Sequence, residues 1–74
     1  MKLDISEIDK SRDELVAIVF QWVVGKNAER DRQVIIRSII DGISYEPLAE
    51  EMNLSVSTVK RIIKKRSHQV LTHF

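Results

Sequence analysis

Apolar residues recur at helical spacing in four segments of the chain, and capping or turn-forming residues separate these segments. Ser11 followed by Glu14 has the spacing of a capping box, in which each side chain bonds the backbone amide of the other residue. A first helix is therefore predicted over residues 12–24, and Gly25, which tolerates a left-handed backbone, is its expected stop.

The apolar residues of this first helix fall on two faces at about 100° per residue. One face, which we expect to lie in the core together with its tryptophan, holds Leu15, Ile18, Val19, Trp22 and Val23. The other points well around the cylinder and holds Val16, Phe20 and Val24. Because a helix with two apolar faces requires burial on more than one side, a partner surface is predicted for the second face.

The middle of the chain predicts two more helices. Asn27 is the expected cap of a helix over residues 28–41, and Gly42 is expected to end it. Ser44 is the expected cap of a third helix over residues 45–52, whose first turn contains a proline that loses no intrahelical hydrogen bond there.

A sharp turn precedes the last helix. Asn53 is a residue type that accepts the left-handed conformation, and Ser55 can cap the helix that follows it. The apolar positions of this fourth helix keep helical spacing at Val56, Val59, Ile62 and Ile63. The tail that follows contains Val70, Leu71 and Phe74. It is expected either to extend this helix or to fold back on the core.

These signals predict an all-α fold in which residues 1–74 form a single four-helix domain. The domain is expected to have an N-terminal helical segment over residues 12–25 and a C-terminal helix-turn-helix over residues 44–66. Ala49 lies where the two helices of the motif approach most closely, since a larger side chain would force them apart. Tyr45 is expected to cover the core of the motif, with a phosphate contact as the alternative.

Charge divides the chain although the net charge is only +1. The first 14 residues hold five acids against three bases, whereas no acid follows Glu51. The bases that follow it cluster at Lys60, Arg61, Lys64, Lys65 and Arg66. Such a cluster on one helix is expected of an element that binds phosphates. The alternative is a solvated basic helix end, stabilised by the helix macrodipole.

The outward positions of the fourth helix suit a DNA major groove, which is wide enough to admit one α-helix. The residues presented to the groove would be Val56, Ser57, Lys60, Arg61 and Lys64. Two short helices joined by a turn, with a polar and basic outer face on the second, are typical of DNA-binding helix-turn-helix proteins.

At this point the run over residues 31–66, DRQVIIRSIIDGISYEPLAEEMNLSVSTVKRIIKKR, resembles a known family. It is similar to the promoter-reading C-terminal domain of bacterial sigma factors, to the related DNA-binding domains of response regulators and to sigma-like phage transcription regulators. The matching positions are Arg32, Gly42, Ile43, Ser44, Tyr45, Glu46, Ala49, Ser55, Thr58, Val59 and Lys60. Where the family usually has a glycine and a glutamate, this chain has Asn53 and Pro47.

The resemblance implies a role for each polar residue of the fourth helix. Phosphate contacts near the helix start are implied for Ser55 and Thr58. Contacts with base edges are implied for Ser57, Lys60 and Arg61. Contacts along the DNA backbone are implied for Lys64, Lys65 and Arg66. Arg61 is the expected base reader because a guanidinium donates two hydrogen bonds to guanine, and its alternative role is a phosphate contact.

Composition argues against a membrane protein, a metal centre and an enzyme. The chain has no cysteine and no apolar stretch near 18 residues, so we expect a cytoplasmic protein without disulfides or a membrane span. His68 and His73 are five residues apart, a spacing that does not place two imidazoles on one helix face, so no metal site is predicted. No cofactor and no catalytic residue are predicted, and a solvated face is expected for Glu46, Glu50 and Glu51.

Three functions fit this pattern. The first is a sequence-specific transcription regulator that binds double-stranded DNA as a homodimer, with an interface made by Val16, Phe20 and Val24. The second is a DNA-recognition accessory of a phage packaging or recombination machine, and the third is a protein-docking module for RNA polymerase. The basic run argues against the third, because a docking face does not need five positive charges without an acid. For the dimer, the alternative is a monomer in which residues 1–10 or the tail through Phe74 cover the second apolar face.

Overall fold

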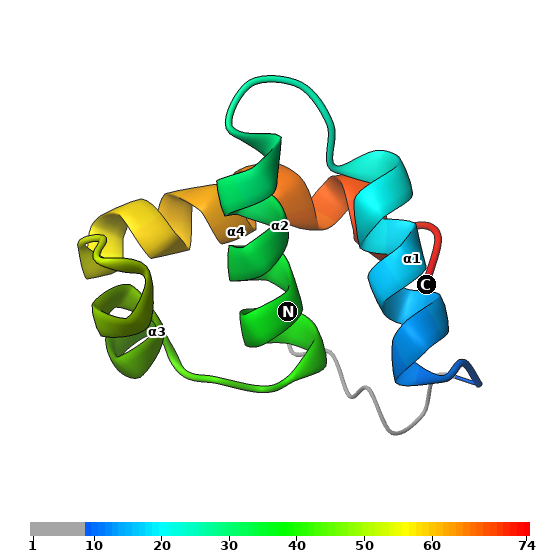
Figure 1. Ribbon diagram of the computed structural model, residues 1–74, viewed down its shortest axis with the longest axis horizontal. Helices are drawn as coiled ribbons and strands as arrows, with labels where there is room; N and C mark the ends of the chain where they lie inside the picture. The colour runs from blue at the N-terminus through cyan, green and yellow to red at the C-terminus, as the bar shows by residue number, and fades with distance from the viewer. Residues whose placement is uncertain (1–8) are drawn as a thin grey trace.

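The computed structural model describes residues 9–74, and over this range the protein is all helical (Figure 1). Its helices are α1 (Arg12–Trp22), α2 (Ala28–Ile35), η2 (Ile36–Ile40), α3 (Tyr45–Met52) and α4 (Val56–Leu71). The η2 segment is a π-helix that continues α2 without a break. The all-α, four-helix fold expected from the sequence is therefore confirmed.

The first helix begins where the capping box predicts. Ser11 Oγ accepts a hydrogen bond from the Glu14 amide at 3.3 Å, and Glu14 Oε1 accepts one from the Ser11 amide at 3.2 Å. The helix ends at Trp22, earlier than expected, because Val23 has an extended backbone with φ −92° and ψ 95°. Gly25 then adopts a φ of 94°, a value that residues with a Cβ rarely adopt, and the chain turns toward α2.

The second helix differs from the expectation at its start and in its second half. Asn27 has a left-handed backbone with φ 62°, and its side chain does not cap α2. In place of one regular helix over residues 28–41, the coil widens into η2. There the Asp41 amide bonds the Ile36 carbonyl, five residues back, at 2.9 Å. Gly42, at φ 73°, follows the segment as expected.

The predicted helix-turn-helix is present as α3 and α4. Ser44 stands at the start of α3, but its side chain does not make the expected capping bond. Asn53 is left-handed at φ 56° and turns the chain, and Ser55 Oγ then caps α4 by accepting from the Thr58 amide at 3.1 Å. The last helix runs on to Leu71, so the tail extends the helix.

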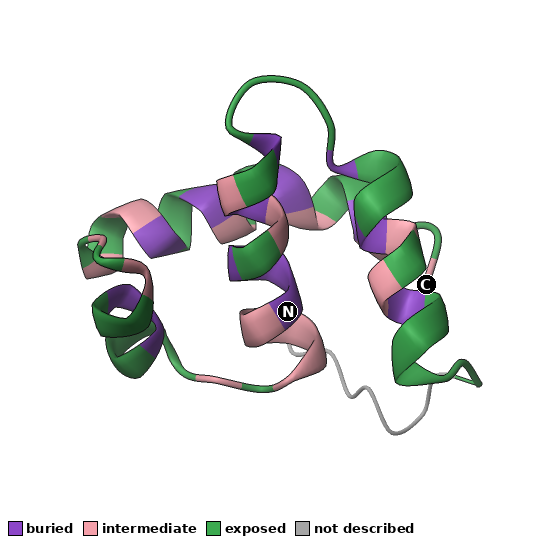
Figure 2. Cartoon of the chain, in the orientation of Figure 1, coloured by how far each residue is buried: buried purple, intermediate pink, exposed green. Residues whose placement is uncertain are grey.

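Two groups of buried side chains hold the helices together (Figure 2). The first joins α1, the α2–η2 helix and the end of α4, and contains Val19, Val23, Ile35, Ile36 and Val70. The second lies beneath the helix-turn-helix and contains Val34, Leu48, Ala49, Val59 and Ile62. Full burial of one such branched side chain contributes roughly 1.5–3 kcal/mol. Because the α2–η2 helix and α4 each contribute to both groups, they join α1 at one end of the molecule to α3 at the other (Figure 1).

Trp22 is a correction to the interpretation of the sequence, since it is 40% exposed and does not lie in the core. The inward stripe of α1 is taken by Leu15, Val19 and Val23, which recur every four residues and are buried. The body behind α1 is too narrow to cover the neighbouring face as well. The indole instead stacks on the imidazole of His73, with ring centroids 3.7 Å apart and an interplanar angle of 4°.

Candidate nucleic-acid interface

The last helix, α4, presents one side to the core and the opposite side to solvent. On the inner side, Val59 and Ile62 are 0% and 3% exposed. The outer side carries five of the residues expected to contact DNA, all of them exposed, namely Ser57, Lys60, Arg61, Lys64 and Lys65. Since α4 contains no acidic residue, four cations stand on this face without a neighbouring carboxylate on the same helix.

The start of α4 is a small cluster of hydroxyl groups. Ser55 Oγ lies 2.8 Å from Thr58 Oγ1 and 3.2 Å from Ser57 Oγ. Thr58 is half-buried, and Val56, which was expected to face a groove, is half-buried against the core beneath the helix-turn-helix. Of this group, Ser55 and Ser57 are therefore the most accessible. A helix start of this kind favours an anion because its free amides and the helix dipole carry partial positive charge.

Tyr45 joins this surface through a contact with Lys60 that the sequence did not predict. Its side chain is 43% exposed, so it does not cover the core as expected. Lys60 Nζ lies 5.5 Å from the centroid of the tyrosine ring, a cation–π contact that restrains the ammonium group. Tyr45 belongs to α3 and Lys60 to α4, so no helical spacing in the sequence links the two residues.

Arg66 does not lie on the outer face, contrary to the expectation that it follows the DNA backbone. It is 5% exposed, and its Nε donates to Asp31 Oδ2 at 2.8 Å. Its two terminal nitrogens donate to the carbonyls of Val24 and Lys26, each at 3.1 Å. This guanidinium therefore fastens α4 to α2 and to the loop after α1, and no phosphate can reach it in this position.

Helical phase explains why Arg66 is buried. It follows Ile62 by four residues and precedes Val70 by four, and both of these residues are in the core. Its partner Asp31 is 2% exposed, and the second carboxylate oxygen of Asp31 accepts from Arg30 Nε at 3.1 Å. A buried charge requires such a partner, so the two residues form a structural ion pair.

Residues 28–65 match the family model described as Sigma-70, region 4, which amounts to 38 of the 74 residues and covers α2, η2, α3 and most of α4. The chain belongs to the Sigma-70 region 4 family. No curated protein and no solved structure matches the chain. Sigma-70 region 4 is a DNA-binding helix-turn-helix rather than an enzymatic domain, so the sigma-like resemblance of the sequence is confirmed.

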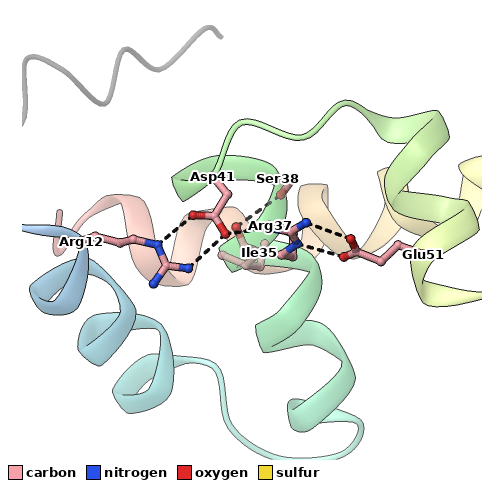
Figure 3. A network of polar contacts seen from close by, with 6 residues as sticks. All are labelled: Arg12, Ile35, Arg37, Ser38, Asp41 and Glu51. Atoms are coloured by element: carbon pink, nitrogen blue, oxygen red, sulfur yellow. Dashed lines mark hydrogen bonds and ion pairs between the residues drawn. The ribbon is translucent and has the colours of Figure 1, made fainter.

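Ion pairs join the Sigma-70 region 4 segment to the helix that precedes it (Figure 3). Arg37 of η2 donates to both carboxylate oxygens of Glu51 on α3, at 2.8 and 2.9 Å, and to Asp41 at 3.1 Å. Arg12 of α1, which lies outside the matched segment, donates to both oxygens of Asp41 at 2.8 and 3.0 Å. One network therefore ties α1 to the first helix of the helix-turn-helix through η2.

The network changes the titration of its members. The hydrogen bond from Arg12 lowers the pKa of Asp41, and the hydrogen bond from Arg37 lowers the pKa of Glu51. The same bonds raise the pKa of Arg12 and that of Arg37. Because the folded carboxyl pKa values are depressed, the network stabilises the fold above the ordinary carboxyl pKa of about 4, and this contribution is lost as the pH falls through the folded values.

Neither a metal centre nor a membrane-spanning helix occurs among residues 9–74. In that range, no three His, Asp or Glu side chains gather where they could hold a metal ion. No helix of this part of the chain is long and apolar enough to cross a membrane. The two histidines occupy separate surfaces, since His68 is exposed on α4 whereas His73 stacks on Trp22.

Proposed function

We propose that this protein is a sequence-specific duplex DNA-binding protein that regulates transcription by inserting residues 56–66 of α4 into the major groove. The observation that carries the proposal is the exposed row formed by Lys60, Arg61, Lys64 and Lys65 on a helix without an acid. Such a row matches a polyanionic partner, because each cation releases a condensed counterion when it meets a phosphate. Membership of the Sigma-70 region 4 family supports a role in transcription.

The two other functions considered for this sequence explain fewer of these observations. A DNA-recognition accessory of a packaging or recombination machine would use the same face of α4, but the family of the chain favours transcription. A protein-docking module for RNA polymerase agrees with the family, but this function does not explain the row of exposed cations on α4. We therefore propose double-stranded DNA as the first partner and RNA polymerase as a second one.

Within this proposal the residues of the interface have different tasks. Arg61 reads a base edge, because its planar guanidinium donates two parallel hydrogen bonds of the kind that guanine accepts. Lys64 and Lys65 contact phosphates, for which a flexible ammonium is suited. Ser55 and Ser57 lie at the accessible start of the helix, the first toward phosphates and the second toward base edges.

A comparison of Arg61→Ala with Lys65→Ala tests sequence-specific reading. Both residues are exposed on α4, so neither change is expected to affect the fold. On a duplex selected from random sequences by the wild type, Arg61→Ala is expected to cost about 1–3 kcal/mol and to relax the preference at one base pair. Lys65→Ala is expected to weaken binding to the selected duplex and to its single-base variants by the same factor.

The measurement is a set of affinities on the selected duplex and on each of its single-base variants at constant salt. Lys65→Ala serves as the matched control, since it removes one cation from the same exposed face. Equal weakening on every duplex by both substitutions would make Arg61 a phosphate contact and would remove the assignment of base reading.

We also propose that the protein acts as a homodimer through the outer face of α1. Of the three residues expected there, Phe20 and Val24 are 48% and 54% exposed, whereas Val16 is half-buried against the core. The tail does not cover Phe20 and Val24, since His73 stacks on Trp22 instead. The other candidate cover was residues 1–10, of which residues 1–8 lie outside the described residues.

The shape of the protomer supports this arrangement. In Figure 1, α1 lies at one end of the molecule and α3 at the other, and α4 runs between them along a longest dimension of 32 Å. A two-fold axis beside α1 therefore places two recognition helices far apart. Because α4 crosses the middle of the protomer, the two copies would be separated by about one protomer length, which is comparable with the roughly 34 Å between paired half-sites on DNA.

Sedimentation equilibrium of the wild type and of Phe20→Glu tests the dimer. The wild type is expected to sediment as a dimer at micromolar concentration, and Phe20→Glu as a monomer, because a carboxylate in an apolar interface is left desolvated. The substitution is compatible with a folded monomer, since the guanidinium of Arg32 already lies 5.0 Å from the Phe20 ring centroid. Gln21→Glu, at an exposed position about 100° around the helix from Phe20, is the control and is expected to remain dimeric. A monomeric wild type, or a dimeric Phe20→Glu, contradicts this interface.

A further inference from the structure

The outer face of α4 does not end with the basic run. The helix continues to Leu71, and His68 stands one turn beyond Lys64 and two turns beyond Arg61 on the same side. These three side chains are all exposed. The imidazole of His68 therefore continues the row of cations along the outer face of α4. The sequence indicated no role for this part of the helix.

The surroundings of His68 leave its imidazole free to meet an anion. No hydrogen bond or ion pair among residues 9–74 involves its side chain, and its charged neighbours one turn back on α4 are Lys64 and Lys65. From α2, the buried carboxylate of Asp31 bonds Arg66 and Arg30 on the opposite side of α4.

The acids of the other packed elements are also directed elsewhere. From α1, the charged residues are Arg12, which bonds Asp41, and the two capping-turn acids Asp13 and Glu14. From α3, Glu51 bonds Arg37, and α3 packs against the first half of α4 through the core that contains Val59. Among residues 9–74, no carboxylate forms an ion pair with His68 or with the cations of this row.

We propose that His68 is a further phosphate-contacting residue of the DNA-binding surface, and that its protonation makes the affinity for DNA depend on pH. The inference rests on the proposed function, to which it adds one phosphate-contacting residue and a dependence of the DNA affinity on pH. With a rise of about 1.5 Å per residue, His68 lies about 10 Å along α4 from Arg61. Because the N-terminal residues of a recognition helix contact the base edges, a residue two turns beyond the base reader lies closer to the DNA backbone.

Imidazole chemistry supplies the pH dependence. The gain of one proton converts a neutral imidazole into a cation, and histidine is the side chain used for such switches near neutral pH. The neutral ring donates one hydrogen bond, whereas the imidazolium adds a positive charge that releases one more counterion from the duplex. Because phosphate stabilises the charged form, DNA binding takes up a proton, and by linkage acid strengthens binding.

The second histidine provides a matched control within the same chain. His73 lies just beyond α4, but its ring is stacked on Trp22 of α1 rather than placed on the outer face of the helix. If a general response of the protein to acid strengthened binding, replacing either histidine would leave that response in place. If the imidazole of His68 causes the stronger binding in acid, only the replacement of His68 removes that response.

The experiment measures the affinity of the wild type, His68→Gln, His73→Gln and His68→Lys for the selected duplex at about pH 8 and about pH 5.5, at constant ionic strength. Binding of the wild type is expected to strengthen about fivefold at the lower pH, and its slope of log affinity against log salt to steepen by about 0.9. His73→Gln is expected to keep this gain, and His68→Gln to lose it. His68→Lys, which carries the charge at both values, is expected to bind at both with the acid affinity of the wild type.

The outcomes separate this inference from the proposed function. Failure of the wild type to bind duplex DNA at the higher pH overturns the proposed function. Binding at the higher pH together with an unchanged affinity at the lower pH overturns only the role of His68. An acid gain that survives in His68→Gln also overturns that role and leaves the DNA-binding face of α4 as described.

Discussion

Replacing Asp31 by leucine is expected to destabilise the domain by about 3–5 kcal/mol, because the substitution leaves the guanidinium of Arg66 buried without its counter-charge. Arg66 is 5% exposed and has no other carboxylate among its contacts, which are the carbonyls of Val24 and Lys26 and the side-chain oxygen of Gln69. A loss of this size is a large part of the stability of so small a domain.

The converse change, Arg66→Met, is expected to cost less. Asp31 then keeps a second partner, since Arg30 Nε already donates to its carboxylate at 3.1 Å. The double variant Asp31→Leu with Arg66→Met is expected to recover most of the loss, because apolar residues of similar volume often replace a buried ion pair with little net cost.

Urea unfolding of the wild type, both single variants and the double variant measures these differences as a double-mutant cycle. Lys65→Met is the control, since Lys65 is the exposed neighbour of Arg66 and its loss is expected to change stability by less than about 0.5 kcal/mol. Equal and additive losses in the two single variants would show that the pair does not act as a unit.

Several features that depend on neighbouring residues could be predicted from the sequence, although the side chains of Asn27 and Ser44 do not make the caps expected of them. The capping box at Ser11 and the cap at Ser55 are set by side chains that bond amides three residues away, and both are present. The left-handed turn at Asn53 likewise follows from the residue type. The helix-turn-helix was accessible to sequence reasoning for this reason.

Features that depend on tertiary contacts could not be predicted in the same way. The π-helical turn of η2 has no local signal, because any apolar run can adopt it when packing requires a wider coil. The exposure of Trp22 depends on how much of α1 the rest of the body covers. The contact between Tyr45 and Lys60 requires the relative placement of two helices.

Arg66 is an intermediate case, because a local signal was present. By charge alone, the three residues Lys64, Lys65 and Arg66 are alike, so the same role was predicted for all three. Counted by helical phase, Arg66 falls on the stripe of Ile62 and Val70, where only a paired charge is tolerated. The number of cations available to DNA from this run is therefore four rather than five.

A fourfold rise in salt, from about 50 to about 200 mM, is expected to lower the affinity for duplex DNA by about 150-fold per protomer at about pH 8. Each protein cation that displaces a condensed counterion contributes about −0.9 to the slope of log affinity against log salt, and a base-reading Arg61 lies within the same counterion atmosphere, so the four exposed cations of α4 give about −3.6. Five contacts, with Arg66 included, would give about −4.5 and a loss of about 500-fold.

The measurement is a salt titration of the affinity, made per protomer on the selected duplex with the wild type and two matched variants. Lys65→Ala is expected to reduce the magnitude of the slope by about 0.9, since it removes one phosphate contact. The double variant Asp31→Leu with Arg66→Met is expected to keep the slope of the wild type, because its lost guanidinium is buried. A slope near zero for the wild type would remove DNA binding through α4. A flatter slope in the double variant would mean that Arg66 leaves the core to meet the DNA.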